Sequence, residues 1–175
     1  MLDNCQRCNN CCTSFGVCLT VFDIIRIATD TGKKPEEFVA LIDDYSPRER
    51  TEPAVMLEGK KRIIVLKHDK RRVCTFFDGK GCGIYDSRPY LCRTYPFTLK
   101  NGDMADVQNR ACAIFWYPKG KNKEEYMKNL EVYYRQIEEY KKIVDEWNSK
   151  HEGGLNDFIE FAAAKAESNL SLGER

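Results

Sequence analysis

The sequence CQRCNNCC, at residues 5–12, holds four of the nine cysteines in this chain of 175 residues. Cys18 follows six residues later, and no further cysteine occurs until Cys74. Three chemistries crowd thiols in this way: disulfide bonds, zinc sites and iron–sulfur clusters. Which of them applies decides how the chain folds around this stretch.

Disulfide bonds fit the sequence worst. The N-terminal residues MLDNCQRC lack the basic start and apolar stretch of a secretory signal, and no apolar run is long enough for a membrane span. The sequence therefore predicts a cytoplasmic protein, and persistent disulfides are rare in the reducing cytosol. An odd number of cysteines also does not complete a disulfide framework.

The spacing of the thiols favours a cluster over zinc. Cys5, Cys8 and Cys11 form a CxxCxxC run, the three-ligand pattern of ferredoxin-type sites, whereas a zinc ribbon would supply a second CxxC pair. No proline follows any cysteine, so the last part of the ferredoxin motif is missing. We predict a [4Fe–4S] cluster, with zinc as the alternative cofactor.

Adjacent Cys11 and Cys12 raise the question of a second site. In extended backbone, neighbouring side chains point to opposite faces. Two adjacent thiols therefore serve two different centres, or one is a ligand and the other a core residue. Nine cysteines are enough for either arrangement.

The second cysteine-rich stretch is CTFFDGKGCGIYDSRPYLCRTYPF, at residues 74–97. Three glycines allow a tight turn around Cys82, and two prolines stiffen the segment that delivers Cys92. Arg88 and Arg93 are candidates to donate hydrogen bonds or positive charge to the sulfurs, or else to form ordinary salt bridges. Both histidines, His68 and His151, are expected at the surface and not as ligands.

Charge is unevenly distributed although the net charge is only +1. Residues 60–100 contain eleven Lys and Arg against three Asp. Such a strip suits an anionic partner, but it also offsets the negative charge of bound thiolates, and we favour the second explanation. Nucleic acid is therefore not the expected partner.

Periodicity and capping signals predict an α+β fold with a short antiparallel sheet. Thr20 and Asp23 form a capping box for a helix that ends at Gly32, and Pro35 starts a second helix over residues 35–44 with Phe38, Leu41 and Ile42 inward. Residues 62–67 and 72–77 are expected to pair as a hairpin that carries Cys74. Residues 46–53 are expected to form a loop before this hairpin, and a second hairpin is expected to turn at Asn101-Gly102.

The C-terminal part is predicted to be helical. Residues 123–147 carry one apolar stripe, made of Tyr126, Leu130, Tyr133, Ile137, Tyr140, Val144 and Trp147. Gly153-Gly154 then breaks the helix, Asn156 caps another, and residues 168–175 fray. We expect residues 1–175 to form a single domain, with a cysteine-cluster core at 1–118 and a helical extension at 119–175.

The cysteine run, a C-x-F segment and the motif GC-x-IY-x-x-RP-x-x-CR-x-YPF together resemble the YkgJ-type CxxCxxCC family, described as zinc- or iron-chelating. The resemblance runs from Cys5 to about Cys112 and includes LTVFDIIRI, where the family has a short helix. Cys18 departs from the family pattern and is expected to be a spare thiol. By position, the resemblance implies these cofactor and metal ligands: Cys5, Cys8, Cys11, Cys12, Cys74, Cys82, Cys92 and Cys112.

Three functions compete on these grounds. The first is an iron–sulfur protein for electron transfer, or an accessory or maturation factor with a protein partner in a redox complex. The second is a structural zinc module for protein or nucleic-acid interaction. The third is an enzyme, since some flagellin lysine methylases have a similar cysteine cluster, but no glycine-rich turn or catalytic triad is visible here. Whichever centre forms, Cys5, Cys8 and one of Cys11 and Cys12 should meet Cys74, Cys82 or Cys92 in space.

Overall fold

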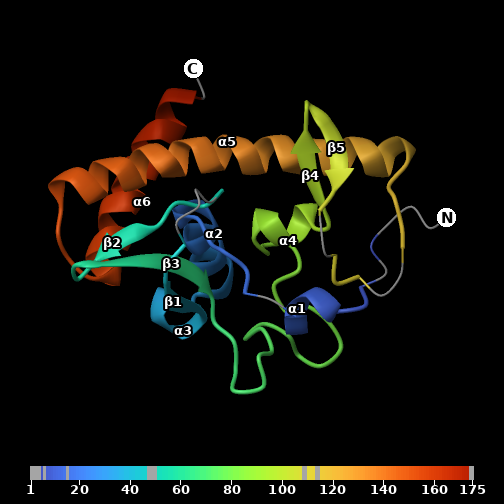
Figure 1. The fold of residues 1–175 in the computed structure, drawn as a ribbon, viewed down its shortest axis with the longest axis horizontal. Coiled ribbons are helices and arrows are strands. Elements are labelled where there is room, and N and C mark those ends of the chain that lie inside the picture. The colour runs from blue at the N-terminus through green and yellow to red at the C-terminus, as the bar shows by residue number, and fades with distance from the viewer. Residues whose placement is uncertain are drawn as a thin grey trace.

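Two antiparallel sheets and a long helix make up an α+β fold, seen here in a computed structural model (Figure 1). The structure describes residues 5, 7–14, 16–46, 51–107, 110–112 and 115–173. Its helices are α1 (Asn10–Ser14), α2 (Val21–Thr31), α3 (Pro35–Phe38), α4 (Tyr90–Thr94), α5 (Gly120–Lys150) and α6 (Leu155–Gly173). Its strands are β1 (Val39–Asp43), β2 (Val55–Leu57), β3 (Lys60–Leu66), β4 (Phe97–Lys100) and β5 (Asp103–Asp106).

Helix α2 begins and ends where the sequence predicts. The Thr20 hydroxyl accepts the Asp23 N–H, and the Asp23 carboxylate accepts the Thr20 N–H, which completes the capping box. Gly32 closes the helix in the left-handed conformation, at φ 67°. Val21, Ile24 and Ile27 are buried on its inner face.

The predicted second helix is wrong beyond Phe38. Helix α3 has only four residues, and the following VALID segment is strand β1, paired antiparallel with β3. Phe38 is buried as expected, but Ile42 is 47% exposed. Pairing with β3 outweighs the helical spacing of this short run, because a branched residue such as Val39 packs well on a pleated surface.

The first predicted hairpin is also wrong. Strand β3 forms as expected, but it lies between β1 and β2, with the order β1-β3-β2. Residues 72–77 form no strand, and Cys74 makes only an isolated bridge with His68. The sequence analysis missed β2, which reaches β3 through a tight turn at Glu58 and Gly59, both with positive φ.

The second hairpin is confirmed. Strands β4 and β5 pair antiparallel, and Asn101 and Gly102 between them have φ values of 54° and 82°. Both residues therefore take the left-handed conformation that a type I′ turn needs. The predicted loop at 46–53 lies partly outside the described residues, and its described residues form no helix or strand.

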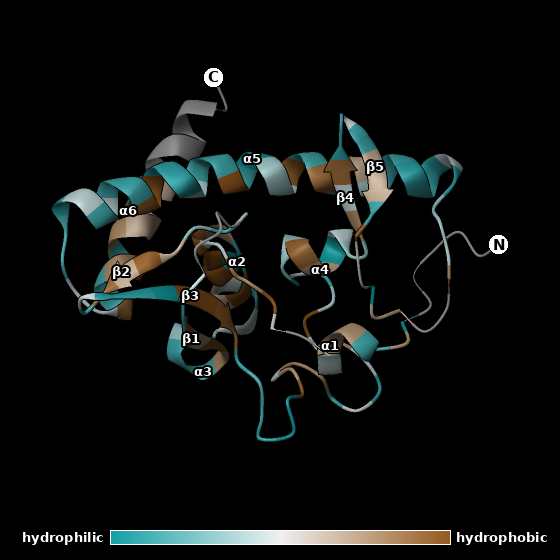
Figure 2. Ribbon diagram, in the orientation of Figure 1, coloured by the Kyte–Doolittle hydropathy of each residue, from teal (hydrophilic) through white to brown (hydrophobic). Residues whose placement is uncertain are grey.

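Helix α5 joins two hydrophobic clusters. It is unbroken over 31 residues, and six of the seven stripe residues are buried, with Tyr126 half-buried. Its first half packs on the β4–β5 hairpin through Leu130, Phe97 and Trp116. Its second half joins α2, α6 and the β1-β3-β2 sheet through Tyr140, Val144 and Trp147. Figure 2 shows α5 as mainly hydrophilic with hydrophobic residues at intervals, as one buried stripe requires.

Helix α6 starts one residue earlier than its predicted cap. Asn156 lies inside the helix, and the N–H of Gly154 is accepted by the carboxylate of Asp157 at 2.8 Å. The helix continues to Gly173, so residues 168–173 are helical and not frayed, while 174–175 lie outside the described residues. No helix within the described ranges has the length and apolar character needed to cross a membrane.

Candidate metal centre

Eight of the nine cysteines line one cavity of about 220 Å³. They come from four separate places: the N-terminal run, the stretch between β3 and α4, α4 itself, and the segment before α5. The cavity therefore gathers thiols that are up to 107 positions apart in the chain, Cys5 and Cys112 being the most distant pair. Those eight are Cys5, Cys8, Cys11, Cys12, Cys74, Cys82, Cys92 and Cys112.

The N-terminal run turns sharply to bring its thiols together. Arg7 and Asn9 have φ values of 50° and 61°, in the left-handed region that is uncommon for side-chain-bearing residues. The chain then enters α1, and the Cys12 N–H donates to the Asn9 carbonyl at 2.9 Å. Cys11 and Cys12 therefore lie on a helical turn and not on the extended backbone assumed from the sequence.

Three hydrogen bonds fasten this run to the other cysteine segments. The Cys74 N–H donates to the Cys12 carbonyl at 2.9 Å. The amide side chain of Asn9 donates to Lys80 O at 3.4 Å, and that of Asn10 donates to Ala111 O at 3.1 Å. The sequence analysis missed both asparagines, although polar residues that tolerate positive φ between cysteines are a usable signal.

Cys82 sits on a tight loop that begins at Asp78. The Asp78 carboxylate accepts the N–H groups of Lys80 and Gly81, both at 2.8 Å, and Gly79 has a φ of 92°. The Gly83 N–H donates to Phe76 O at 2.8 Å. These bonds fold residues 74–83 back on themselves, so that Cys74 and Cys82 face the same cavity.

Helix α2 holds the segment between Cys82 and Cys92 in place. Buried Asp23 accepts the Tyr90 N–H at 3.1 Å and pairs with Arg26 at 2.5 Å. Arg26 in turn donates to the carbonyls of Ser87 and Arg88, both at 3.2 Å. The predicted helix after the cysteine run thus acts as the anchor for α4, which carries Cys92.

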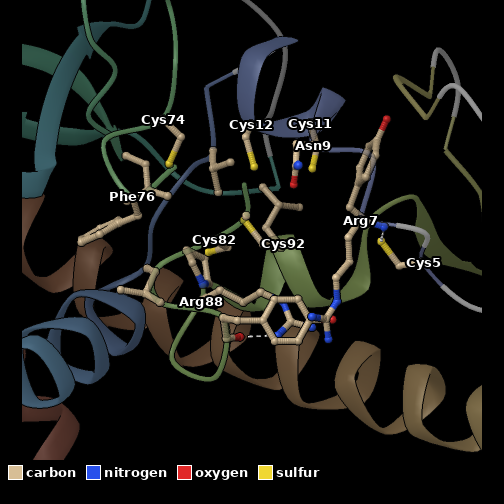
Figure 3. Close-up of a pocket in the computed structure, with 18 of the residues that line it drawn as sticks. Cys5, Arg7, Asn9, Cys11, Cys12, Cys74, Phe76, Cys82, Arg88 and Cys92 are labelled. Atoms are coloured by element: carbon tan, nitrogen blue, oxygen red, sulfur yellow. Dashed lines mark hydrogen bonds between the residues drawn. The ribbon is translucent and has the colours of Figure 1, made fainter. Parts of the chain in front are cut away.

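Backbone amides point at several of the sulfurs. The Arg7 N–H donates to Cys5 Sγ at 3.4 Å, a contact drawn in Figure 3. The backbone N–H groups of Phe76 and Ile84, two residues after Cys74 and Cys82, lower the pKa of those two thiols. Because a donated N–H stabilises the charged form of a thiol, this recurring contact prepares the sulfurs for binding as thiolates.

Burial of the thiols opposes that effect. It is the largest influence on Cys74, Cys82 and Cys92, and it raises the pKa of each thiol. Cys11 behaves differently, because a hydrogen bond from Cys12 lowers its pKa to about 7, and the positive charge of Arg88 acts in the same direction. The same hydrogen bond raises the pKa of Cys12.

The thiols divide into two groups around the cavity. Figure 3 shows the sulfurs of Cys12, Cys74, Cys82 and Cys92 directed into one space, with Cys5 at the far side beside Arg7. Negative charge on Cys74 or Cys82 raises the pKa of Cys92. Negative charge on Cys74 or Cys92 raises the pKa of Cys12. Cys5 is instead in electrostatic range of Cys8 and Cys112. Cys11 is in range of both groups and lies between them.

Other predicted residues lie elsewhere. Cys18 does not line the cavity, and its backbone forms an isolated antiparallel β-bridge with Val65. His68 is half-buried, which corrects its expected surface position, and its Nε2 is buried with no hydrogen-bond partner among the described residues. His151 is exposed and stacks on Trp147. Neither histidine lines the cavity.

The two arginines of the second stretch have different positions. Arg88 lines the cysteine cavity, with its guanidinium 3.7 Å from the centre of the Tyr85 ring. Arg93 does not line this cavity. Neither forms an ion pair with a carboxylate in the part of the chain that the structure describes, so the salt-bridge alternative finds no partner there.

The residues fit a thiolate-bound metal. Eight sulfurs line the cavity, the described residues of its lining include no His, Asp or Glu, and the Arg7 N–H donates to Cys5 Sγ. Within the described ranges, no three acidic, histidine or cysteine side chains are close enough to share one metal ion. The eight thiols thus surround a space and do not converge on a single point.

Comparison with known proteins agrees with this chemistry. The model of the CxxCxxCC family, described as "Putative zinc- or iron-chelating domain", matches residues 4–113, a span that contains all nine cysteines. No curated protein matches the chain, and no solved structure matches it. The match covers more than half of the chain and stops before α5. The chain therefore belongs to the CxxCxxCC family of zinc- or iron-chelating domains.

Proposed function

We propose that the cysteine cavity binds an iron–sulfur cluster of the [4Fe–4S] type, and that the protein transfers electrons or serves as an accessory or maturation factor in a redox complex. The observation that carries this proposal is the gathering of eight thiols, from four separate segments, around one cavity. Thiolates are the usual ligands of such clusters, and Cys₄ ligation is their commonest form.

The size and lining of the cavity favour a cluster over one zinc ion. Its volume is about 220 Å³, more than the roughly 150 Å³ of an engineered cavity that holds a benzene molecule, so a group of several atoms fits it. Its walls include the apolar side chains of Val17, Leu66, Phe76, Ile84 and Leu91. An apolar shell limits the access of water and so tunes the potential of a bound centre.

We assign the cluster to the inner group of Cys12, Cys74, Cys82 and Cys92. These four are mutually placed by the Cys12–Cys74 backbone bond, the Asp78 loop and the α2 anchor of α4. The outer group, made of Cys5, Cys8 and Cys112, is the candidate for a second centre, which Cys11 could complete from its place between the two groups. A bound cluster would supply one-electron redox chemistry, while the chain supplies the amide donors and the positive charge of Arg88.

The position of the outer group suits exchange of electrons with a partner. Cys5 is exposed, whereas Cys74 is buried, so the row of thiols runs from the interior to the surface. A protein partner that covers the Cys5 side would then approach the centre without crossing either hydrophobic cluster. This makes the N-terminal run the proposed contact region of a redox partner.

Spectroscopy of anaerobically purified protein tests this function. We expect a brown protein whose visible absorption bleaches on reduction with dithionite, together with a paramagnetic signal in one of the two oxidation states. A colourless protein with no signal and bound zinc would contradict the proposal. That result would favour the structural zinc module, in which four thiolates draw together around one tetrahedral zinc ion.

A further inference from the structure

A second cavity, of about 190 Å³, adjoins the cysteine cavity and has a different lining. It lies between the first half of α5 and the loop that precedes α4. The two cavities share a wall that includes Cys5, Arg7, Tyr85, Arg88 and Tyr126. Unlike its neighbour, the second cavity is lined mainly by polar and charged side chains.

Three guanidinium groups meet in this polar cavity. Arg7, Arg88 and Arg93 line it, against a single carboxylate, that of Glu125. Its lining therefore has an excess of positive charge.

The guanidinium groups are held in place without being neutralised. The guanidinium carbons (Cζ) of Arg7 and Arg88 lie 4.2 and 3.7 Å from the centre of the Tyr85 ring. Arg93 donates to the backbone carbonyls of Arg88 and Asp86. Among the described residues, none of these arginines is paired with a carboxylate, so each keeps donors for another acceptor.

The thiolates account for only part of this charge. Arg88 lines both cavities, so its positive charge lies beside the thiols as well as in the polar cavity. Arg93 lines the polar cavity alone. The amide side chains of Asn122 and Asn129, from α5, line the same cavity and add further polar groups. Arg93 therefore offers positive charge and further N–H donors on a side of this site that the thiols do not line.

We propose that the polar cavity binds the oxyanion group of a small molecule, either a carboxylate or a phosphate. The planar fork of arginine matches both groups and forms two parallel hydrogen bonds with either. A ligand held there would lie beside Cys5, at the exposed end of the thiol row. Its closeness to a metal centre rests on the proposed function, but the binding of the oxyanion itself does not.

Isothermal titration of the full-length protein, purified without oxygen, tests this site. Inorganic phosphate and citrate are titrated separately at constant ionic strength into wild type, Arg93→Gln and Arg135→Gln. Arg135 is an exposed arginine on α5 that does not line the polar cavity, and it is the control. We expect saturable 1:1 binding of one probe to wild type and to Arg135→Gln, and at least tenfold weaker binding to Arg93→Gln. The tighter probe identifies the ligand as a phosphate or a carboxylate.

A second variant guards against misfolding of Arg93→Gln. Asn129→Asp keeps the size of the side chain and adds a negative charge to the cavity, so it should also weaken binding at least tenfold. Absence of saturable binding to wild type, or equal binding to wild type and Asn129→Asp, would overturn the proposal. Metal analysis of the same samples separates the two proposals: zinc in place of iron contradicts the proposed cluster and leaves the oxyanion site standing.

Discussion

Cys18 and Cys82 are both half-buried thiols, but only Cys82 lines the cysteine cavity. Replacing Cys82 by serine removes one of the four proposed cluster ligands, and we expect the bound metal and the visible absorption to be lost. Cys18→Ser should keep both, with a change in the free energy of unfolding of about 1 kcal/mol or less. Iron, zinc and sulfide analysis of the two variants checks this.

The control in this pair is the shared substitution. Both variants replace a half-buried cysteine by serine, so a general effect of this substitution would appear in both. Equal loss of metal from Cys18→Ser, or full retention by Cys82→Ser, would remove Cys82 from the ligand set.

The buried thiols also predict how stability depends on pH. Burial raises the pKa of Cys74, Cys82 and Cys92, so the metal-free folded chain keeps protons that the unfolded chain releases above about pH 8.5. The free energy of unfolding of the metal-free protein should therefore fall between pH 7.5 and 9.5. Anaerobic urea unfolding with a chelator present measures it.

In the metal-loaded protein, the free energy of unfolding should change with pH in the opposite direction. Its bound sulfurs are thiolates, and unfolding below about pH 8.5 returns protons to them, so its stability should rise with pH until that point. Parallel curves for the loaded and metal-free forms would mean that these thiols are not the ligands.

At the scale of elements, α2 is the support of the metal site although it carries no ligand. Asp23→Ala removes the acceptor of the Tyr90 N–H and leaves Arg26 unpaired at a half-buried position. We expect a loss of about 3–5 kcal/mol in stability and weaker metal binding, because the segment between Cys82 and Cys92 loses its anchor. Urea unfolding and a chelator competition measure the two effects.

Asp43→Ala is the matched control for this prediction. Asp43 pairs with Arg62 near the surface, and losing that pair should cost about 0–1 kcal/mol without changing metal affinity. If Asp23→Ala binds metal as tightly as Asp43→Ala does, α2 does not position the site.

Elements whose signals are local were predictable from the sequence. The Thr20 capping box, the Asn101-Gly102 turn and the apolar stripe of α5 each depend on residues close together in the chain. Strand β1 was not predictable in this way, because its partner β3 begins 17 residues after β1 ends. Residues 72–77 have the composition of a strand, but the Asp78 loop turns them toward the cavity instead.

The candidate site could be predicted in part for the same reason. Cysteine spacing and the family resemblance indicate which thiols to consider, and all eight line the cavity. The supporting contacts of Asn9, Asn10 and Asp23 join segments far apart in the chain, so no local pattern reveals them. The polar cavity was missed for this reason too, since its arginines meet only in the folded chain.

At the scale of the whole molecule, α5 connects the β4–β5 hairpin to the rest of the core. Leu130 belongs to one hydrophobic cluster, and Tyr140, Val144 and Trp147 belong to the other. We therefore predict that residues 1–118 and 119–175 unfold together as one domain. Thermal unfolding followed by far-UV circular dichroism and by near-UV tyrosine and tryptophan signals should give one shared midpoint. Two separate transitions would show that the helical extension is an independent unit.

The identity of the bound species is the central claim, and the metal and sulfide content of anaerobically purified protein tests it most directly. We expect about four iron atoms and about four acid-labile sulfides per chain for one [4Fe–4S] cluster, with little zinc. Zinc at about one or two per chain, with iron and sulfide far below stoichiometry, would contradict it and identify the cysteine cavity as a zinc site.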